Sequence, residues 1–306
     1  MTTVLVATEK PFAKVAVNGI SDILKKTGFE MKLLEKYTSK QQLLDAVKDV
    51  DAIIIRSDIV DEEVINAGNK LKIVVRAGAG YDNVDLKAAT NKGVVVMNTP
   101  GQNANAVAEL AIGMLIYLNR NFFNGSSGVE LRGKTMGIHA YGHVGRLIGM
   151  IAKGMGMDVF AFDPLVEKVI IENDGVKALT SARELYSKCQ YVSVNLPANK
   201  ETKESVNFEL LSVMPEGATL VNPARKEIIH EPSLLKMFAE RKDFRYATDT
   251  APDCEAQIKA EYPNRYFATP KKMGAQTEEA NINAGLAAAR QIVNFILKGD
   301  KTFQVN

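Results

Sequence analysis

Apolar segments of strand length alternate with helical segments along the chain, and this alternation constrains the fold more than any other feature. Residues 3–8 read TVLVAT and are followed by an amphipathic pattern over residues 14–28; further apolar segments lie at residues 51–57, 71–78 and 94–98. Short apolar runs of this kind are typical of strands buried on both faces. Because parallel strands need crossover helices, the pattern predicts parallel sheets covered by helices.

A second strand–helix series begins at Gly133, so the sequence predicts two α/β units. A long apolar helical pattern over residues 103–121 precedes this series. The last predicted helix starts at residue 278 and stops at Gly299. Its apolar stripe is expected to contain Ile282, Leu286, Val293 and Leu297.

Composition and charge favour a globular protein of the cytoplasm. Of the 306 residues, 46% are hydrophobic, and the 38 basic and 36 acidic side chains are spread evenly. Without a block of one charge sign, we expect neither nucleic acid nor a membrane as a partner. The N-terminus lacks the features of a signal peptide, and the apolar runs are too short to span a membrane. Cys189 and Cys254 stand far apart, so we expect reduced thiols and no bound metal.

The most informative loop reads HAYGHVG and runs from His139 to Gly145. It lies between a predicted strand and a predicted helix, where a dinucleotide-binding turn uses glycines for close approach to a pyrophosphate. Asp163 ends the next strand, 18 positions after Gly145, where it can accept hydrogen bonds from ribose hydroxyls and repel a 2′-phosphate. The spacing fits this motif, although an alanine replaces the first glycine. The sequence therefore predicts NAD as the cofactor, held by Ala140, Tyr141, Gly142, His143, Val144, Gly145 and Asp163.

Six segments resemble the D-isomer-specific 2-hydroxyacid dehydrogenases, and the sequence is similar to this family over essentially its whole length. They are RAGAGYDNVDL at 76–86, VVVMNTPGQNANAVAELAIG at 94–113, GKTMGIHAYGHVGRLIG at 133–149, the Asp-Pro pair at 163–164, VNPARKEIIH at 221–230 and ATDTAPDCE at 247–255. The resemblance implies an α/β fold of two domains. A Rossmann-type doubly wound parallel sheet of residues 98–271 is inserted into a flavodoxin-like substrate domain of residues 1–97 and 272–306. It also implies an NAD-dependent enzyme that acts on a 2-hydroxy acid.

The resemblance assigns residues of the second unit by matching position. Arg225 corresponds to the arginine that grips the substrate carboxylate and polarises its carbonyl, a role suited to a planar bidentate donor. Asp249 corresponds to the residue that hydrogen-bonds the nicotinamide carboxamide. Pro197 and Pro223 fall at further cofactor-binding positions.

The resemblance also places substrate contacts in the first unit. Arg56 matches an arginine that members acting on 3-phospho-D-glycerate direct at the substrate phosphate; the alternative for Arg56 is a surface ion pair with Asp58 or Asp61. The substrate carboxylate is expected at backbone amides of a small-residue loop. The expected contacts are Ala77, Gly78 and Ala79, with Asn103 as a further substrate-binding residue.

The chain departs from this family at the catalytic acid–base residue. The family uses a histidine in a Thr-Pro-His-x-Gly segment, whereas residues 269–274 here read TPKKMG. The matching residue is Lys271 when counted from Pro270 and Lys272 when counted back from Gly274. The glycine that opens the following turn favours Lys272.

The carboxylate partner of the catalytic residue shifts in a similar way. The position of the family's glutamate is filled by Cys254, with Glu255 one residue later and Asp253 one residue earlier. Glu255 is our first candidate for the paired carboxylate and Asp253 the second. Of the three histidines, His139 and His143 belong to the dinucleotide turn. The third, at residue 230, is expected to cap a helix or face solvent.

A lysine can take over the role of the histidine. An ordinary lysine ammonium has a pKa of about 10.4 and readily donates a proton in the direction of reduction. To act as a base its pKa must fall toward neutrality, which a nearby Arg225 favours and pairing with Glu255 opposes. We therefore expect oxidation to run best at alkaline pH. The alternative is that both lysines are solvated and only attract an anionic substrate.

The resemblance implies NAD-dependent oxidation of 3-phospho-D-glycerate to 3-phosphohydroxypyruvate, the first step of L-serine biosynthesis. Two alternatives stay open: a reductase of glyoxylate, hydroxypyruvate or another 2-keto acid, and a non-catalytic NAD-sensing protein. We expect a homodimer formed through the helix over residues 103–119, although the following segment, residues 119–135, is shorter than in most relatives of this kind. Because the chain stops at Asn306, C-terminal regulatory domains and feedback inhibition through them are not expected.

Overall fold

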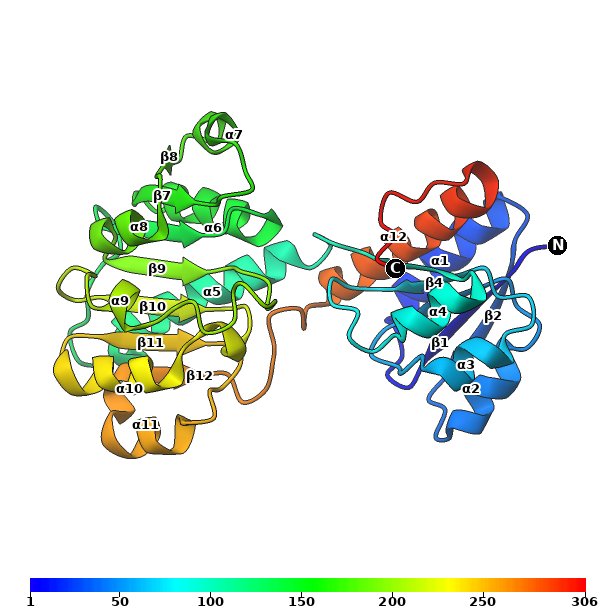
Figure 1. Cartoon of the computed structure of the whole chain (residues 1–306), viewed down its shortest axis with the longest axis horizontal. Helices are drawn as coiled ribbons and strands as arrows, with labels where there is room; N and C mark the ends of the chain where they lie inside the picture. Colours follow the sequence, from blue (N-terminus) through cyan, green and yellow to red (C-terminus); the bar gives the residue numbers. More distant parts are fainter. The chain divides into compact units, whose positions relative to one another are not determined.

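The computed structural model describes residues 1–306, which form two α/β units. The first unit consists of Met1–Asn103 and Gln276–Asn306, and the second of Ala104–Ala275 (Figure 1). The chain thus leaves the first unit once and returns to it with its last helix. The boundaries expected from the sequence, after residues 97 and 271, fall a few residues before these.

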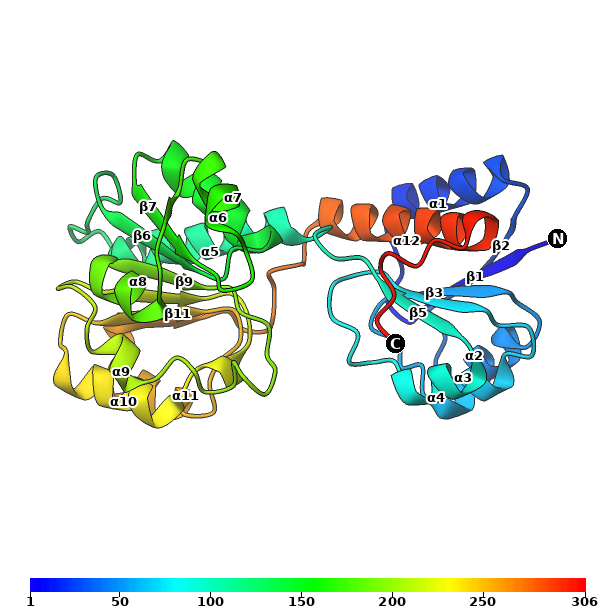
Figure 2. The same ribbon diagram turned by 45° about the horizontal axis from the view of Figure 1, so that its top comes forward.

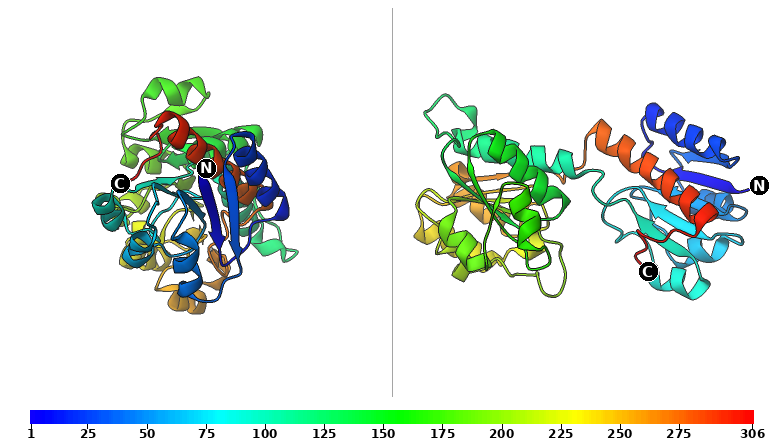
Figure 3. Two further views of the ribbon diagram at one scale, coloured as in Figure 1. Left: turned by 90° about the vertical axis from the view of Figure 1, so that its right-hand side faces the viewer. Right: turned by 90° about the horizontal axis from the view of Figure 1, so that it is seen from above.

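The first unit is a five-stranded parallel sheet with helices on both faces. Its strands are β1 (Thr3–Thr8), β2 (Glu30–Glu35), β3 (Ala52–Ile55), β4 (Ile73–Arg76) and β5 (Val95–Asn98), in the order β2-β1-β3-β4-β5. Helices α1 (Lys14–Lys26) and α12 (Glu278–Lys298) lie side by side on one face (Figures 2 and 3). The other face carries α2 (Lys40–Val47), α3 (Glu62–Ala67) and α4 (Leu86–Lys92). This strand order is flavodoxin-like, as the sequence predicted.

The second unit is a seven-stranded parallel sheet in the order β12-β11-β10-β9-β6-β7-β8. Its strands are β6 (Thr135–His139), β7 (Asp158–Phe162), β8 (Lys177–Ala178), β9 (Tyr191–Val194), β10 (Thr219–Asn222), β11 (Arg245–Thr248) and β12 (Tyr266–Ala268). The strand order reverses between β6 and β9, which confirms the predicted doubly wound sheet.

Helices cover both faces of this second sheet. One face packs against α5 (Ala104–Asn119) and α6 (His143–Gly154), and the other against α8 (Ala182–Lys188), α9 (Phe208–Leu211) and α10 (Glu231–Glu240). Two further helices are α7 (Lys168–Asn173) and α11 (Glu255–Glu261), and short 3-10 turns lie at Asn121–Phe123, Lys226–Ile228 and Pro263–Arg265. None of the helices in the structure has the length and apolar character that a membrane crossing requires.

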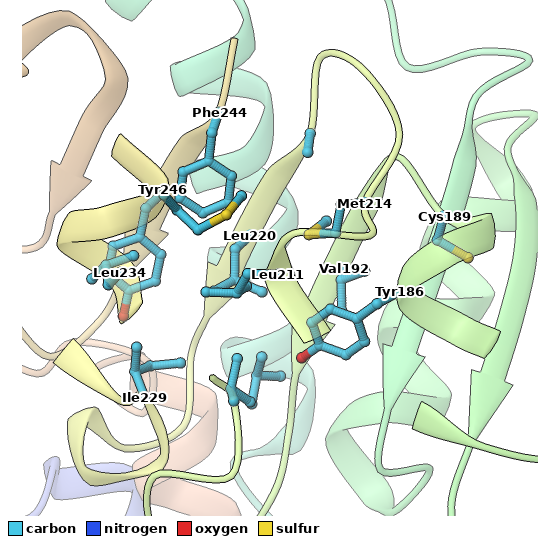
Figure 4. Close-up of a cluster of buried hydrophobic side chains, with 14 of the residues drawn as sticks. Tyr186, Cys189, Val192, Leu211, Met214, Leu220, Ile229, Leu234, Phe244 and Tyr246 are labelled. Carbon is cyan, nitrogen blue, oxygen red and sulfur yellow. The ribbon is translucent and has the colours of Figure 1, made fainter. Parts of the chain in front are cut away.

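The core beneath α8, α9 and α10 fixes the strands from which the site loops emerge. Tyr186, Leu211, Leu220 and Phe244 are fully buried there and converge on one apolar cluster (Figure 4). Burying side chains of this size stabilises the fold by roughly 1.5–3 kcal/mol each. The strand ends are therefore a rigid base for the loops that follow them.

The second sheet contains a strand, β12, that the apolar pattern of the sequence did not indicate. Helix α11 and strand β12 follow β11, and β12 pairs with β11 at the edge of the seven-stranded sheet. The strand β12 has three residues, which is too short to show a periodic pattern. Its position matters because the lysine-containing segment at residues 269–274 starts where β12 ends.

Candidate active site

The residues predicted for the site lie in loops at the carboxyl edges of the two sheets, the edge at which open α/β sheets bind ligands. In the second unit the predicted residues follow six neighbouring strands: Asp163 follows β7, the turn from Ala140 follows β6, Pro197 follows β9, Arg225 follows β10, Asp249 follows β11, and residues 269–274 follow β12. In the first unit Arg56 follows β3, Ala77–Ala79 follow β4 and Asn103 follows β5. We call residues 269–274 the lysine loop.

The turn between β6 and α6 keeps a dinucleotide-turn conformation. A Cβ at Gly145 would overlap the carbonyl oxygen of Ala140 and lie 2.9 Å from Cγ2 of Ile138, so only glycine lets α6 pack this closely on β6. Ala140 has a φ of +74°, a left-handed value that suits the glycine usual in this motif. Holding an alanine there costs roughly 1–2 kcal/mol. The close packing of α6 on β6 thus outweighs the preference of alanine for a negative φ.

The N-terminus of α6 presents its first amides at this turn. Gly142 is the N-cap, and His143 and Val144 are the first helical residues, the first exposed and the second half-buried. The first N–H groups of a helix have no acceptor within it and carry the positive end of its dipole. This end of α6 therefore suits an anionic group such as a pyrophosphate.

Asp163 is fixed beside the same turn. Its Oδ2 accepts a hydrogen bond from the N–H of Tyr141 at 2.8 Å, and its Oδ1 accepts one from the N–H of Leu165 at 2.8 Å. The Tyr141 side chain turns into the core, where its hydroxyl donates to Asp174 at 3.1 Å. Tyr141 thus contributes only its backbone to the turn, whereas the half-exposed carboxylate of Asp163 can still accept hydrogen bonds from a ligand.

Arg225 extends from the end of β10 with most of its donors unused. Its carbonyl oxygen accepts a hydrogen bond from Nδ2 of Asn222 at 2.9 Å, and its Nη1 lies 3.3 Å from the carbonyl oxygen of Ala224. The backbone is thus anchored while the half-buried guanidinium keeps donors for a ligand. Pro223 is buried just before it, and Pro197 lies in an exposed loop after β9.

Asp249 is fully buried, and its carboxylate holds the lysine loop. Oδ1 accepts hydrogen bonds from the N–H of Met273 at 2.7 Å and the hydroxyl of Thr269 at 2.9 Å. Oδ2 accepts one from the N–H of Gly274 at 2.8 Å. The loop is therefore anchored at both ends, while Lys271 and Lys272 between the anchors are exposed. None of these anchoring contacts was anticipated from the sequence.

The carboxylates expected beside the lysines have partners of their own. Oε1 of Glu255 accepts a hydrogen bond from the Tyr266 hydroxyl at 3.1 Å and lies 2.9 Å from Nζ of Lys259. Asp253 pairs with Lys226. These contacts hold both carboxylates at the start of α11.

Cys254, which stands at the family's glutamate position, is not a base. Burial, reinforced by the neighbouring carboxylate of Glu231, raises the pKa of its thiol to about 12. The thiol is therefore protonated near neutral pH. It cannot replace a carboxylate as a partner for the lysines.

The three histidines lie outside the lysine loop. His139 is buried with Nδ1 3.2 Å from the Tyr186 hydroxyl, and burial lowers its pKa to about 4, so its ring is neutral near pH 7. His230 occupies the N-cap position of α10, with Nδ1 2.6 Å from the hydroxyl of Ser233. His143 is exposed at the start of α6. No group of three or more metal-ligating side chains is present.

In the first unit, main-chain groups hold the guanidinium of Arg56. Its Nη1 donates to the carbonyl oxygens of Lys10 and Pro11, each at 3.0 Å, and its Nη2 donates to Asn281. The guanidinium also lies 5.2 Å from the centroid of the Phe12 ring. Its position is therefore fixed before any ligand arrives, and some of its five donors stay unused.

The ion-pair alternative for Arg56 is wrong. Asp61 pairs with Lys40 at 2.7 Å. Asp58 is buried, and its carboxylate accepts from the backbone N–H of Arg56 at 3.0 Å, from that of Glu9 and from the Tyr37 hydroxyl. Neither carboxylate forms an ion pair with the guanidinium; burial lowers the pKa of Arg56, and the charge of nearby Asp58 opposes this shift.

The small-residue loop after β4 offers unbonded amides only from Ala79 onward, two residues after the first expected contact, Ala77. The N–H of Ala77 donates to the carbonyl of Ile55 at 2.8 Å, and the N–H of Gly78 donates to that of Arg76 at 2.9 Å. The next two amides, of Ala79 and Gly80, make no hydrogen bond within the protein. An anion at this loop is therefore expected at Ala79 and Gly80. Asn103 is half-buried just before α5.

The chain is similar to known dehydrogenases. A family model described as D-isomer specific 2-hydroxyacid dehydrogenase, catalytic domain, matches residues 12–306. D-3-phosphoglycerate dehydrogenase of Methanocaldococcus jannaschii is 32% identical over 280 residues, covering 86% of this chain and 52% of the relative. That of Archaeoglobus fulgidus is 33% identical over 308 residues, covering 95% and 56%. The chain thus spans about half the length of these curated relatives.

Solved structures show the same similarity. The crystal structure of NAD⁺-bound 3-phosphoglycerate dehydrogenase of Entamoeba histolytica is 48% identical, covers 100% of this chain and 98% of its own, and has a TM-score of 0.87. The apo-structure of D-lactate dehydrogenase from Escherichia coli is 22% identical, with complete coverage of both chains (100% each) and a TM-score of 0.77. The second likeness shows the fold alone.

Proposed function

The chain belongs to the D-isomer specific 2-hydroxyacid dehydrogenase family, and from this premise we propose that it oxidises 3-phospho-D-glycerate to 3-phosphohydroxypyruvate with NAD. The names of the relatives suggest the substrate, and the NAD⁺ bound to the Entamoeba histolytica enzyme suggests the cofactor. The observation that carries the proposal is the set of loops on adjacent strand ends, with Arg225 after β10, Asp249 after β11 and the lysine loop after β12. The reaction is the first step of L-serine biosynthesis.

The turn at the start of α6 and the Asp163 carboxylate fit NAD. Gly145 leaves room for a close backbone approach, and the first amides of α6 suit a pyrophosphate. Asp163 has a fixed carboxylate that suits two ribose hydroxyls and opposes a 2′-phosphate. When bound, NAD supplies the hydride acceptor. The protein's own residues bind it, orient the substrate and move the proton.

Arg225 binds the substrate carboxylate and polarises the reacting carbon–oxygen bond, because its guanidinium has donors to spare. The amides of Ala79 and Gly80 contribute to carboxylate binding, and Arg56 binds the phosphate. Lys272 takes the hydroxyl proton as the hydride leaves and returns it in the reverse reaction. We assign Lys272 in preference to Lys271 because it directly precedes Met273, whose amide is anchored to Asp249.

Replacing Arg56 by methionine is expected to raise the Michaelis constant for 3-phosphoglycerate by about 10- to 100-fold. This is the size of effect expected when one charge-assisted hydrogen bond to the phosphate is lost. The constant for glyoxylate, which has no phosphate, stays close to its wild-type value. Steady-state kinetics of the variant with both substrates measure the effect. Equal changes for the two substrates would show that Arg56 only supports the fold.

Replacing Asp163 by asparagine is expected to reduce the preference for NAD over NADP by about 10- to 100-fold, because a like-charge repulsion with the 2′-phosphate is removed. The matched control is Glu167→Gln, which removes an exposed charge four positions later and leaves the preference intact. Ratios of kcat/KM for the two cofactors provide the measurement. An unchanged ratio in the Asp163 variant contradicts the assignment.

One assay tests the proposed function against its alternatives. NADH absorbance is followed with 3-phosphoglycerate, D-glycerate and D-lactate, and with glyoxylate in reverse. The proposal requires the highest kcat/KM with 3-phosphoglycerate. Preferred turnover of glyoxylate identifies a 2-keto acid reductase, and NAD binding without turnover identifies a sensor. The homodimer and the cytoplasmic location expected from the sequence stay predictions.

A further inference from the structure

We propose that Asp249 is a positioning residue, whose carboxylate sets the place of the catalytic lysine by holding both ends of the lysine loop. This inference rests on the proposed function, since it assigns a role within the same site. It goes beyond the nicotinamide contact that the family resemblance implies. It is based on the observation that the fully buried carboxylate of Asp249 accepts three hydrogen bonds from a single loop.

The hydrogen-bond pattern requires a carboxylate. Both oxygens of Asp249 accept from backbone N–H groups, Oδ1 from Met273 and Oδ2 from Gly274. An asparagine has one acceptor oxygen, so its NH₂ group would face one of these two N–H donors. The Thr269 hydroxyl lies 2.9 Å from Oδ1 and 3.0 Å from the carbonyl oxygen of Asp249, which joins the first end of the loop to the same residue.

The lysine loop packs closely against the Asp249 carboxylate. A Cβ at Gly274 would lie 3.0 Å from Oδ2 of Asp249 and 3.1 Å from Cγ2 of Val107 on α5, so a side chain there would crowd both neighbours. The backbone of Asp249 is itself fixed, because its N–H donates to the carbonyl of Asn222 at 3.0 Å. Asp249 therefore connects the lysine loop to strand β10 of the sheet.

The two anchors define where the lysines sit. Residues 270–272 span the distance between Thr269 and Met273, both of which contact the same carboxylate. Lys272 is bonded directly to the anchored amide of Met273, whereas Lys271 is one residue further from it. A displacement of about 1 Å at a reacting group can cost about 100-fold in rate, so loss of the anchors changes turnover without removing any group that reacts.

The test separates positioning from cofactor contact by leaving the carboxylate in place. In Thr269→Val the hydroxyl is lost at nearly constant shape, and kcat is expected to fall about tenfold, the equivalent of one hydrogen bond. NAD affinity, measured by calorimetry, stays close to wild type. Thr269→Ser keeps the hydroxyl and restores turnover relative to Thr269→Val. Asp249→Asn is expected to lower kcat about 100-fold.

A second readout does not depend on turnover. Amide hydrogen exchange of the peptide that contains Met273 and Gly274 is expected to accelerate in Asp249→Asn and in Thr269→Val, while exchange in β10 and β11 is unchanged. If exchange in this peptide stays at the wild-type rate in both variants, the proposal is wrong. It is also wrong if Asp249→Asn weakens NAD binding and leaves the exchange of the loop unaltered. An inactive wild-type protein would overturn the proposed function, and the exchange data would still decide the role of Asp249.

Discussion

Replacing Lys272 by methionine is expected to lower kcat for 3-phosphoglycerate oxidation about 10²- to 10⁴-fold, the range of a lost general acid–base group. Methionine keeps the length of the side chain and removes the group that carries the proton. The Michaelis constants change less than kcat, because Arg225, Arg56 and the amides of the small-residue loop still bind the substrate. Initial rates of NADH formation at saturating substrate measure the effect.

Lys271→Met is the matched control, because it makes the same replacement one residue away in the same exposed loop. Its kcat is expected to stay within about threefold of wild type, the range of a modest change in a surface charge. If both variants turn over like wild type, the lysines only attract the anionic substrate. A large loss in Lys271→Met with none in Lys272→Met would assign the proton to Lys271 instead.

Replacing Gly145 by alanine is expected to destabilise the protein by about 1–3 kcal/mol, the usual cost of overpacking. The new Cβ would overlap the carbonyl oxygen of Ala140 and press on Ile138, so α6 must move away from β6. Because the dinucleotide turn lies between these two elements, NAD affinity falls at the same time. Chemical denaturation gives the stability, and calorimetry gives the affinity.

Gly154→Ala is the control for this change, since it adds the same methyl group to the same helix. A Cβ at Gly154 meets no atom within 4 Å. Stability is therefore expected to hold or to rise by up to about 1 kcal/mol, the difference in helix propensity. Equal effects of the two replacements would show that the close packing of α6 on β6 is not what requires Gly145.

The sequence predicted most of the strands because they depend on local patterns. Buried runs such as those of β1 and β3 are apolar at nearly every position, and parallel strands bring their following loops to one edge. The helix stop at Gly299 also follows from local chemistry, since this residue has a φ of +68°.

The parts that the sequence did not predict depend on partners far along the chain. In α12 the predicted stripe included Leu297, which is 57% exposed, whereas the buried face is rich in alanine, including Ala284 and Ala288. Small residues let α12 approach its neighbours closely, which a scale based on hydrophobicity does not register. In the same way, the carboxylate that anchors Met273 lies 24 residues earlier. The amide of Ala77 is likewise used by the carbonyl of Ile55, 22 residues earlier.

We propose that a lysine, Lys272, carries the proton of an NAD-dependent oxidation. The most direct measurement is chemical rescue of Lys272→Ala by small alkylamines such as methylamine and ethylamine, with 3-phosphoglycerate and NAD at saturation. If Lys272 carries the proton, added amine restores NADH formation in this variant, and rates rise with amine concentration while Lys271→Ala and wild type do not respond. Full activity of Lys272→Ala without amine, or an amine response confined to Lys271→Ala, would contradict it.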